Sequence, residues 1–461
     1  MGIGRRIVRC ASVALAAGLA LVGTAACNDG ISLDPASTSG RTPPAATSSD
    51  SGVADSGATG DTADTIPPDL PVDLPPVGEC PSGCVPGSVQ LWSWDEPVEP
   101  KQPPAATHEL IGILHANRLQ MPGTIHVADN RDEAPWLTSL GLDGTYLTSE
   151  AVDIGCGCSL TSMDFDPLWG HILFGARDPG DQPPDYFAVC RYVPEIGQRL
   201  WTEVFGTVFP EDATPRVGSV FALANGDSGI LVLQDHPNIG LPMVEQLQLF
   251  RFDIDGGFLG APELDTQAPT ADDNFPLAVT VDHDTVAIAF GSFNGIEEQG
   301  YVAWVHPQAD LVEDVVPLPA PPGDLVALPN GTTLAASLVE TQRGLGRLDV
   351  VRAAPLAGSG WTVTVEVPTS FVSRPSIALD STGAAWVAVA IADQPDGPAH
   401  IRLLHLDAAG QLLSSSDLPL AATLETRSVV IATDTEDDLL LATHIDGRLH
   451  VERRRSGCAC E

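Results

Sequence analysis

Residues Ser376 to Asp393 read SIALDSTGAAWVAVAIAD, and this stretch decides the fold. A short apolar segment, SIAL, precedes the turn DSTG, and the nearly all-apolar run AAWVAVAIA follows it. Short segments rich in Val, Ile and aromatic residues, bounded by Asp and Gly, are typical of β-strands and tight turns. A strand that is apolar at almost every position is expected to be buried on both faces. The next segment, AHIRLLHLDAAGQLLSSSDLP, adds an alternating strand, a second Asp/Gly turn and a fourth strand. The stretch therefore predicts a four-stranded antiparallel unit.

The same order of strands and turns recurs along the chain. Seven copies, spaced about 50 residues apart, match the period of propeller blades. The other copies begin with IGILHANRLQMPGTIHVADN, SMDFDPLWGHILFGARD, SVFALANGDSGILVLQD, LAVTVDHDTVAIAFGSF, GDLVALPNGTTLAASLVE and SVVIATDTEDDLLLATHIDGRLHVERRR. We therefore expect an all-β fold, a β-propeller of seven four-stranded blades.

One copy resembles a known repeat. The segment IALDSTGAAWVAVA is similar to the strand–turn–strand unit of NHL-type and related bacterial propeller repeats. It differs from the Asp-box of sialidases, because Gly383 lies three residues after Asp380 rather than two. The resemblance implies the architecture alone, since propellers serve both as binding proteins and as enzymes.

The two ends of the repeat region complement each other. The last copy lacks a fourth strand after GRLHVERRR, and the segment GSVQLWSWDE before the first copy has no blade of its own. We expect Val89 to Trp94 to complete the final blade, because this pairing removes an exposed sheet edge.

The N-terminus has the features of an export signal. Arg5, Arg6 and Arg9 precede an apolar run from Ala11 to Val22, as in secretory signals. Thr24, Ala25 and Ala26 directly before Cys27 resemble the bacterial lipobox, with Thr24 where that pattern prefers Leu. The resemblance implies a signal peptide over residues 1–26, cleavage before Cys27 and lipid attachment to its sulfur. The alternative is an ordinary cleaved signal followed by an incidental cysteine. We expect a lipid-anchored protein of the bacterial cell envelope that faces the periplasm or the exterior.

Composition divides the exported chain at residue 80. Residues 27–79 are rich in Ser, Thr, Pro and Asp and contain no aromatic side chain. Such a segment cannot bury enough apolar surface to offset the entropy of ordering, so we expect a disordered tether. Residues 80–461 have the composition of a folded domain and form the expected propeller.

The charge of the chain restricts its partners. It carries 61 acidic and 22 basic residues, a formal net charge of −39. Nucleic-acid binding depends largely on Lys and Arg contacts to phosphate, so nucleic acid is not an expected partner. The membrane is expected to be contacted through the lipid, and a protein or a carbohydrate remains a candidate partner.

Seven cysteines follow Cys27, and export makes disulfides the default. In one set of pairings, Cys80 or Cys84 bonds to Cys458 or Cys460, where the two chain ends meet at the closing blade. In the other set, the two cysteines of each closely spaced doublet bond to each other. A zinc site with four cysteine ligands from two of these doublets is the alternative, although the doublets lack the usual flanking zinc knuckles. Cys190, within the strand YFAVCRYV, is expected to be a buried thiol. The disulfide candidates are Cys80, Cys84, Cys156, Cys158, Cys458 and Cys460.

No stretch of the sequence matches a catalytic motif, so we assign no catalytic residue, metal or cofactor. Acids in FDIDGGF and TADDN are candidate calcium ligands, but turn formation explains them better. His283, between two aspartates, is expected in a surface turn, and Arg453 to Arg455 at a solvated strand end. The candidate calcium ligands are Asp253, Asp255, Asp272 and Asp273.

Two functions therefore remain open. The first is a binding or scaffold propeller displayed on a lipid anchor. The second is an envelope-located, sugar-acting hydrolase, whose paired acids would meet at the channel mouth only in three dimensions.

Overall fold

A computed structural model of the chain describes eighteen segments of the region after residue 86. They are residues 87, 89–96, 108–118, 121–179, 186–206, 216–236, 244–266, 276–281, 285–293, 298–308, 311–328, 330–342, 344–356, 358–369, 371–392, 398–423, 429–445 and 448–456. The expected signal peptide, Cys27 and tether lie outside these segments. The only helical element among the described residues is the single 3₁₀ turn η1 (Pro194–Ile196), and none of their helices is long and apolar enough to cross a membrane.

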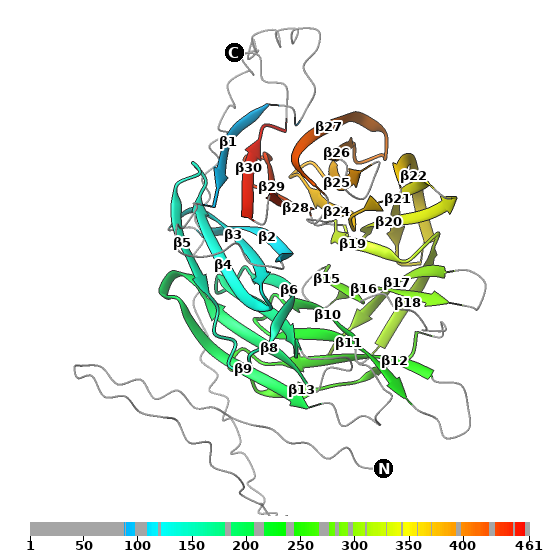
Figure 1. Cartoon of the computed structure of the whole chain (residues 1–461). Coiled ribbons are helices and arrows are strands. Elements are labelled where there is room, and N and C mark those ends of the chain that lie inside the picture. The colour runs from blue at the N-terminus through cyan, green and yellow to red at the C-terminus, as the bar shows by residue number, and fades with distance from the viewer. Residues whose placement is uncertain are drawn as a thin grey trace, which may run out of the picture. The chain divides into compact units, whose positions relative to one another are not determined.

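Seven antiparallel sheets form the body, and Figure 1 shows them arranged around a common centre. We number the blades in chain order. Blades 1 to 3 comprise β2 (His108–Arg118), β3 (Met121–Arg131), β4 (Ala134–Gly141) and β5 (Tyr146–Ala151); β6 (Ser159–Asp166), β7 (His171–Arg177), β8 (Tyr186–Val193) and β9 (Gln198–Gly206); and β10 (Arg216–Ala222), β11 (Ser228–His236), β12 (Val244–Phe252), β13 (Phe258–Gly260) and β14 (Glu263–Leu264). Blades 4 to 7 comprise β15 (Leu277–Thr280), β16 (Val286–Phe293), β17 (Glu298–His306) and β18 (Leu311–Leu318); β19 (Pro322–Ala327), β20 (Thr333–Gln342), β21 (Gly344–Ala354) and β22 (Gly358–Thr369); β23 (Phe371–Val372), β24 (Ser376–Leu379), β25 (Ala385–Ala392), β26 (Pro398–Leu406) and β27 (Leu412–Thr423); and β28 (Val429–Thr433), β29 (Leu439–Ile445), β30 (Arg448–Arg454) and β1 (Gln90–Asp95). The expected seven-bladed propeller is confirmed.

The strand β25 shows why the repeat is apolar at consecutive positions. All eight of its residues are buried. Because successive side chains of a strand point to opposite faces, Trp386 and alternate residues after it pack toward blade 7, and the residues between them pack toward blade 5. Each blade is thus sandwiched between two others, and seven apolar clusters lie between successive blades around the ring.

The Asp/Gly turns of the repeat share one hydrogen-bonding pattern. The Oδ1 atom of Asp380 accepts the backbone N–H of Thr382 and of Ala384, each at 2.9 Å. Gly383 then adopts a φ of 81°, which glycine tolerates without steric cost. The same arrangement surrounds Asp407 and Asp253. The turn therefore explains the spacing of three between Asp and Gly that the sequence repeats.

The last blade is closed by the first strand, as predicted. β1 pairs antiparallel with β30, and the backbone N–H of Glu96 donates to the carbonyl of Leu449 at 2.9 Å. The pairing also ties blade 7 to blade 1, because Trp92 Nε1 donates to the carbonyl of Leu142 at 2.8 Å. Figure 1 shows β1 at the outer edge of this blade, beside β30.

The prediction for Arg453 to Arg455 is wrong for its first two residues. The Arg453 guanidinium bonds to Asp434 at 2.7 Å, and the Arg454 side chain is buried against Glu452, also at 2.7 Å. Pairing with β1 turns this segment from a strand end into the interior of a sheet. Arg453 and Arg454 therefore lie within blade 7 rather than on a solvated end, and Arg455 follows the last residue of β30.

Candidate binding site in the central channel

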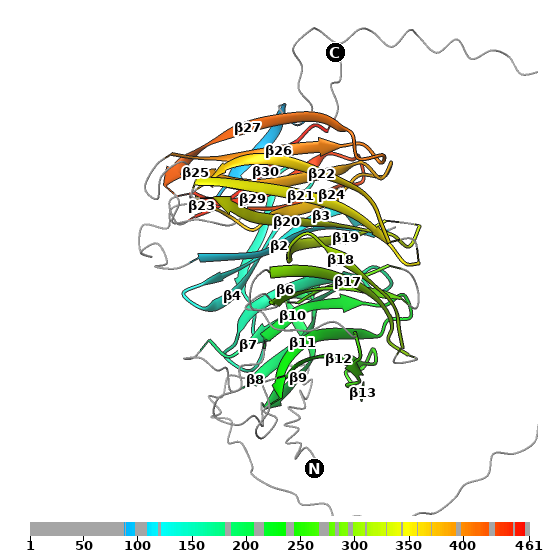
Figure 2. The same ribbon diagram turned by 90° about the vertical axis from the view of Figure 1, so that its right-hand side faces the viewer.

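The inner strands of all seven blades line one central channel. Figure 1 shows the blades around the centre of the ring, and Figure 2 shows the same ring turned by 90°. Its volume is about 740 Å³, within the range typical of small-molecule sites. The lining combines aliphatic side chains with hydroxyl groups and four charged residues. The charged residues are Glu109, Asp164, Asp324 and Arg374.

Two aspartates on the channel wall hold neighbouring blades together. Asp164 Oδ2 on β6 accepts the backbone N–H of Ala222 on β10 at 2.8 Å. Asp324 Oδ2 on β19 accepts the N–H of Ile377 on β24, also at 2.8 Å, and the hydroxyl of Ser376. Because inner strands of successive blades do not form a ladder with each other, these carboxylates satisfy backbone groups that would otherwise lack a partner.

Enclosure of the two carboxylates changes their protonation. Desolvation by burial raises the pKa of Asp164 to about 6, against the opposing effect of its bonds to backbone N–H groups. The same cause raises the pKa of Asp324 to about 6. Both groups therefore titrate close to neutral pH, while their oxygens remain engaged in bonds between blades.

Hydroxyl groups repeat this tie at other positions. Ser162 Oγ donates to the carbonyl of Gly218 at 3.1 Å and accepts the N–H of Val220 at 3.0 Å. Thr161 differs, because its buried Oγ1 has no hydrogen-bond partner among the described residues.

A pair of opposite charges stands at one end of the channel. Glu109 is the second residue of β2, and Arg374 comes just before β24; both side chains are exposed. All inner strands run in the same sense, since the four strand positions of each blade alternate in direction; β13 and β14 share one position in blade 3, and β23 and β24 share one in blade 6. Glu109 attracts Arg374 electrostatically, and Asn130 Nδ2 approaches Glu109 Oε2 at 3.4 Å. The channel mouth thus presents both an anionic and a cationic side chain to a partner.

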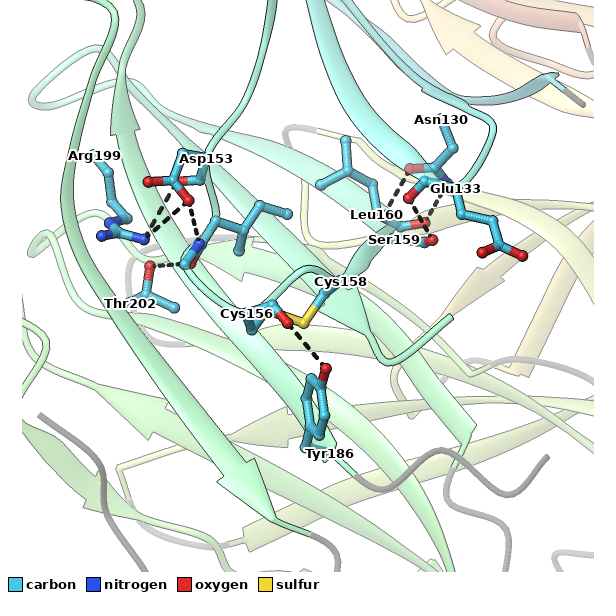
Figure 3. The surroundings of a disulfide bond; sticks show 12 residues. Asn130, Glu133, Asp153, Cys156, Cys158, Ser159, Leu160, Tyr186, Arg199 and Thr202 are labelled. Atoms are coloured by element: carbon cyan, nitrogen blue, oxygen red, sulfur yellow. Dashed lines mark hydrogen bonds and ion pairs between the residues drawn. A yellow bond between two sulfur atoms is a disulfide. The ribbon is translucent and has the colours of Figure 1, made fainter. Parts of the chain in front are cut away.

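The connection between blades 1 and 2 carries a disulfide, shown in Figure 3. Cys156 and Cys158 are bonded to each other. Of the two predicted alternatives, pairing within the doublet is therefore the one found for these two cysteines. Tyr186 donates its hydroxyl to the carbonyl of Cys156 at 2.9 Å, and Thr202 donates to the carbonyl of Ile154 at 2.8 Å. The bridge and these bonds fix the connection against blade 2, away from the channel lining.

Of the other candidate residues, Cys190, Asp253 and Asp255 lie in the described part of the chain. Cys190 is a buried free thiol, and burial raises its pKa to about 12, so it is not a ready nucleophile. Asp253 uses its Oδ1 to cap a turn, in agreement with the predicted turn role. No group of three or more His, Cys, Asp and Glu side chains able to hold a metal occurs among the described residues. Outside those residues lie Cys80, Cys84, Cys458, Cys460, Asp272, Asp273 and His283.

The charged residues of the channel were not found by reading the sequence. Asp164 and Asp324 lie inside ordinary strand patterns, SMDFD and GDLVA, without any flanking motif. Their positions on the channel wall follow only once the ring is closed. The one signal available was an acid inside an inner strand, where a buried charge needs partners.

Comparisons with known proteins give no family. No family model matches the chain, and no curated protein matches it. Among solved structures, similar chains include the Kuenenia stuttgartiensis hydrazine synthase (10% identity, 72% of this chain and 93% of that chain, TM-score 0.47). An oligogalacturonate lyase in complex with manganese (9%, 76% and 98%, 0.44) and a subtype N10 neuraminidase-like protein of A/little yellow-shouldered bat/Guatemala/060/2010 (13%, 78% and 98%, 0.40) are also similar. At these identities and TM-scores they carry no functional information for this chain.

Proposed function

We propose that this protein is a binding module of the bacterial cell envelope, anchored through a lipid on Cys27 and presenting the channel mouth to a protein or carbohydrate partner. The observation that carries the proposal is the channel itself. Every blade contributes to its lining, and the exposed Glu109 and Arg374 lie at its mouth. The carboxylates of Asp164 and Asp324 on its wall accept hydrogen bonds from the next blade and so join neighbouring blades.

The engagement of the acids favours binding over the sugar-acting hydrolase. A glycosidase needs one carboxylic acid to protonate the leaving oxygen and a second carboxylate to act as base or nucleophile. Asp164 and Asp324 have pKa values suited to a general acid, near 6. Their oxygens, however, accept hydrogen bonds from the next blade, and proton transfer to a substrate would break these ties.

The channel is tested with a soluble form of the chain that carries Cys27→Ser, applied to an array of defined oligosaccharides and peptides. We expect one class to be retained, and the variants Glu109→Gln and Arg374→Gln to weaken its binding about ten- to 150-fold, the effect of removing a hydrogen bond to a charged group. Asp143→Asn is the matched control, because this exposed carboxylate caps a turn and is absent from the channel lining.

Retention that is unchanged in both mouth variants would place the partner elsewhere and contradict the proposal. Release of new reducing ends from a bound oligosaccharide, lost in Asp164→Asn and Asp324→Asn, would establish the hydrolase instead. The anchor is tested separately: Cys27→Ser should abolish fatty-acid labelling and detergent partitioning, and a variant that remains in the membrane fraction would refute it.

A further inference from the structure

A second cavity, separate from the channel, lies between blades 1 and 2, which are neighbours in Figure 1. Its volume is about 300 Å³. All four strands of blade 1 contribute to it, and blade 2 adds Phe165, Gly170 and the start of η1. This volume is at the lower end for small-molecule sites, which suits a ligand of one ring.

Two buried polar side chains form its floor. His126 on β3 and Ser139 on β4 are directly opposite each other in the sheet, and they are only 4% and 6% exposed. His126 Nδ1 lies 2.9 Å from Ser139 Oγ. Burying such groups costs free energy unless they are hydrogen-bonded, and here each side chain is a partner of the other at the wall of the cavity.

The floor is uncharged at neutral pH. Desolvation by burial, followed by repulsion from His115, lowers the pKa of His126 to about 4. A neutral imidazole has one donor and one acceptor nitrogen, and a serine hydroxyl both donates and accepts. Sugar hydroxyl groups have the same dual capacity.

The walls of the cavity combine apolar side chains with hydroxyl groups and one carboxylate. Phe165 and Leu147 offer apolar surface, and Thr124 and Thr148 add hydroxyl groups. Glu195 is the one charged residue among the described residues of the lining. An anionic ligand would face this carboxylate in a chain of net charge −39, and the described residues of the lining include no Lys or Arg to compensate for it.

We infer that this cavity binds one uncharged or amine-bearing hexose, either free or as the end of a glycan. The ring would place its apolar C–H surface toward Phe165 and its hydroxyl groups toward His126 and Ser139. The cavity and the channel share no described lining residue, so this inference does not depend on the proposed function.

The test is saturation-transfer NMR followed by calorimetry with the Cys27→Ser chain. The probes are glucose, galactose, mannose, glucosamine, glucuronate and glucose 6-phosphate, and the first four also as non-reducing ends of linear oligosaccharides. We expect at least one of the first four to bind and the two anions not to bind. Binding of the free sugar alone would identify a monosaccharide site, and binding of both forms would identify a glycan-end site.

Variants locate the binding. Ser139→Ala should weaken it about three- to tenfold, the loss of one neutral hydrogen bond, and Ala116→Leu should abolish it by filling the cavity. Ser149→Ala is the matched control: its hydroxyl pairs with Thr138 in the same blade, and Ser149 does not line the cavity. If Ser139→Ala fails to fold, Ala116→Leu still decides. Absence of transfer to every uncharged sugar, preference for the anions, or binding unaffected by Ala116→Leu would overturn the inference.

Discussion

Blade 6 and blade 7 have the same four-stranded plan but are stabilised differently. Blade 6 comes from one continuous stretch, residues 371–423, and its strand β25 is buried at every position with apolar side chains. Blade 7 joins residues 90–95 to residues 429–454, and its sheet contains the buried Glu452 and Arg454. The comparison teaches that the blade formed by local hairpins keeps its ion pair, Arg402 with Asp417, partly exposed, whereas the blade that closes the ring adds a buried pair, Arg454 with Glu452, to long-range strand pairing.

The largest single-residue effect should come from the packing side of this comparison. Trp386 is fully buried between blades 6 and 7 and stacks on His405 at 4.0 Å between ring centroids. Trp386→Ala should lower the free energy of unfolding by about 4 kcal/mol, because it leaves a large cavity. Urea denaturation measures this loss. The control is Trp169→Ala at a 47% exposed position, which should cost less than about 1 kcal/mol. Equal losses in the two variants would mean that β25 is not the tightly packed element described here.

The next effect concerns the buried pair of blade 7. Arg454→Ala leaves Glu452 buried without its guanidinium partner and should cost about 3 kcal/mol. The double variant Arg454→Met with Glu452→Leu removes both charges, so it should recover most of that loss. Measured together with the single variants Arg454→Met and Glu452→Leu, the same denaturation experiment gives the coupling energy of the two residues. Additive losses would show that the pair does not act as a unit.

The smallest effect is a dependence on pH at the closing strand. Burial opposes the charged form of His450, but hydrogen bonds to Glu452 and Asp95 prevail and raise its pKa. Folding therefore favours the protonated imidazole. Its contribution is fully present below pH 6.5 and is lost as the pH rises through the higher folded value.

His450→Gln should remove this dependence while costing less than about 1 kcal/mol at pH 6, because Asp95 is largely exposed and solvent screens the pair. Unfolding measured from pH 6 to pH 8 gives the two slopes. An identical slope in the variant and the parent would assign the titration to another group.

The sequence contained most of the information on the blades and little on the sites. The alternation in HIRLLHLD, the Asp-to-Gly spacing and the unpaired segment SVQLWSWD are local, so they predict strands, turns and the closing pairing. Charged residues were harder to place. Arg454 reads as a solvated end until β1 covers it, and Asp164 reads as a strand residue until β10 lies beside it. The floor of the second cavity, His126 with Ser139, likewise depends on a cross-strand register that the sequence does not display.

Closure of the ring by β1 is the central claim, and one measurement tests it directly. Residues 89–96 are deleted from the otherwise intact Cys27→Ser chain, and residues 51–58 are deleted from a control of equal length. Thermal unfolding and amide hydrogen exchange are then followed in both. We predict that loss of β1 lowers the melting temperature by about 10 °C or more and accelerates exchange in β30 and in β2, while the control melts like the parent. A β1 deletion that melts and exchanges like the parent would contradict closure of the ring by this strand.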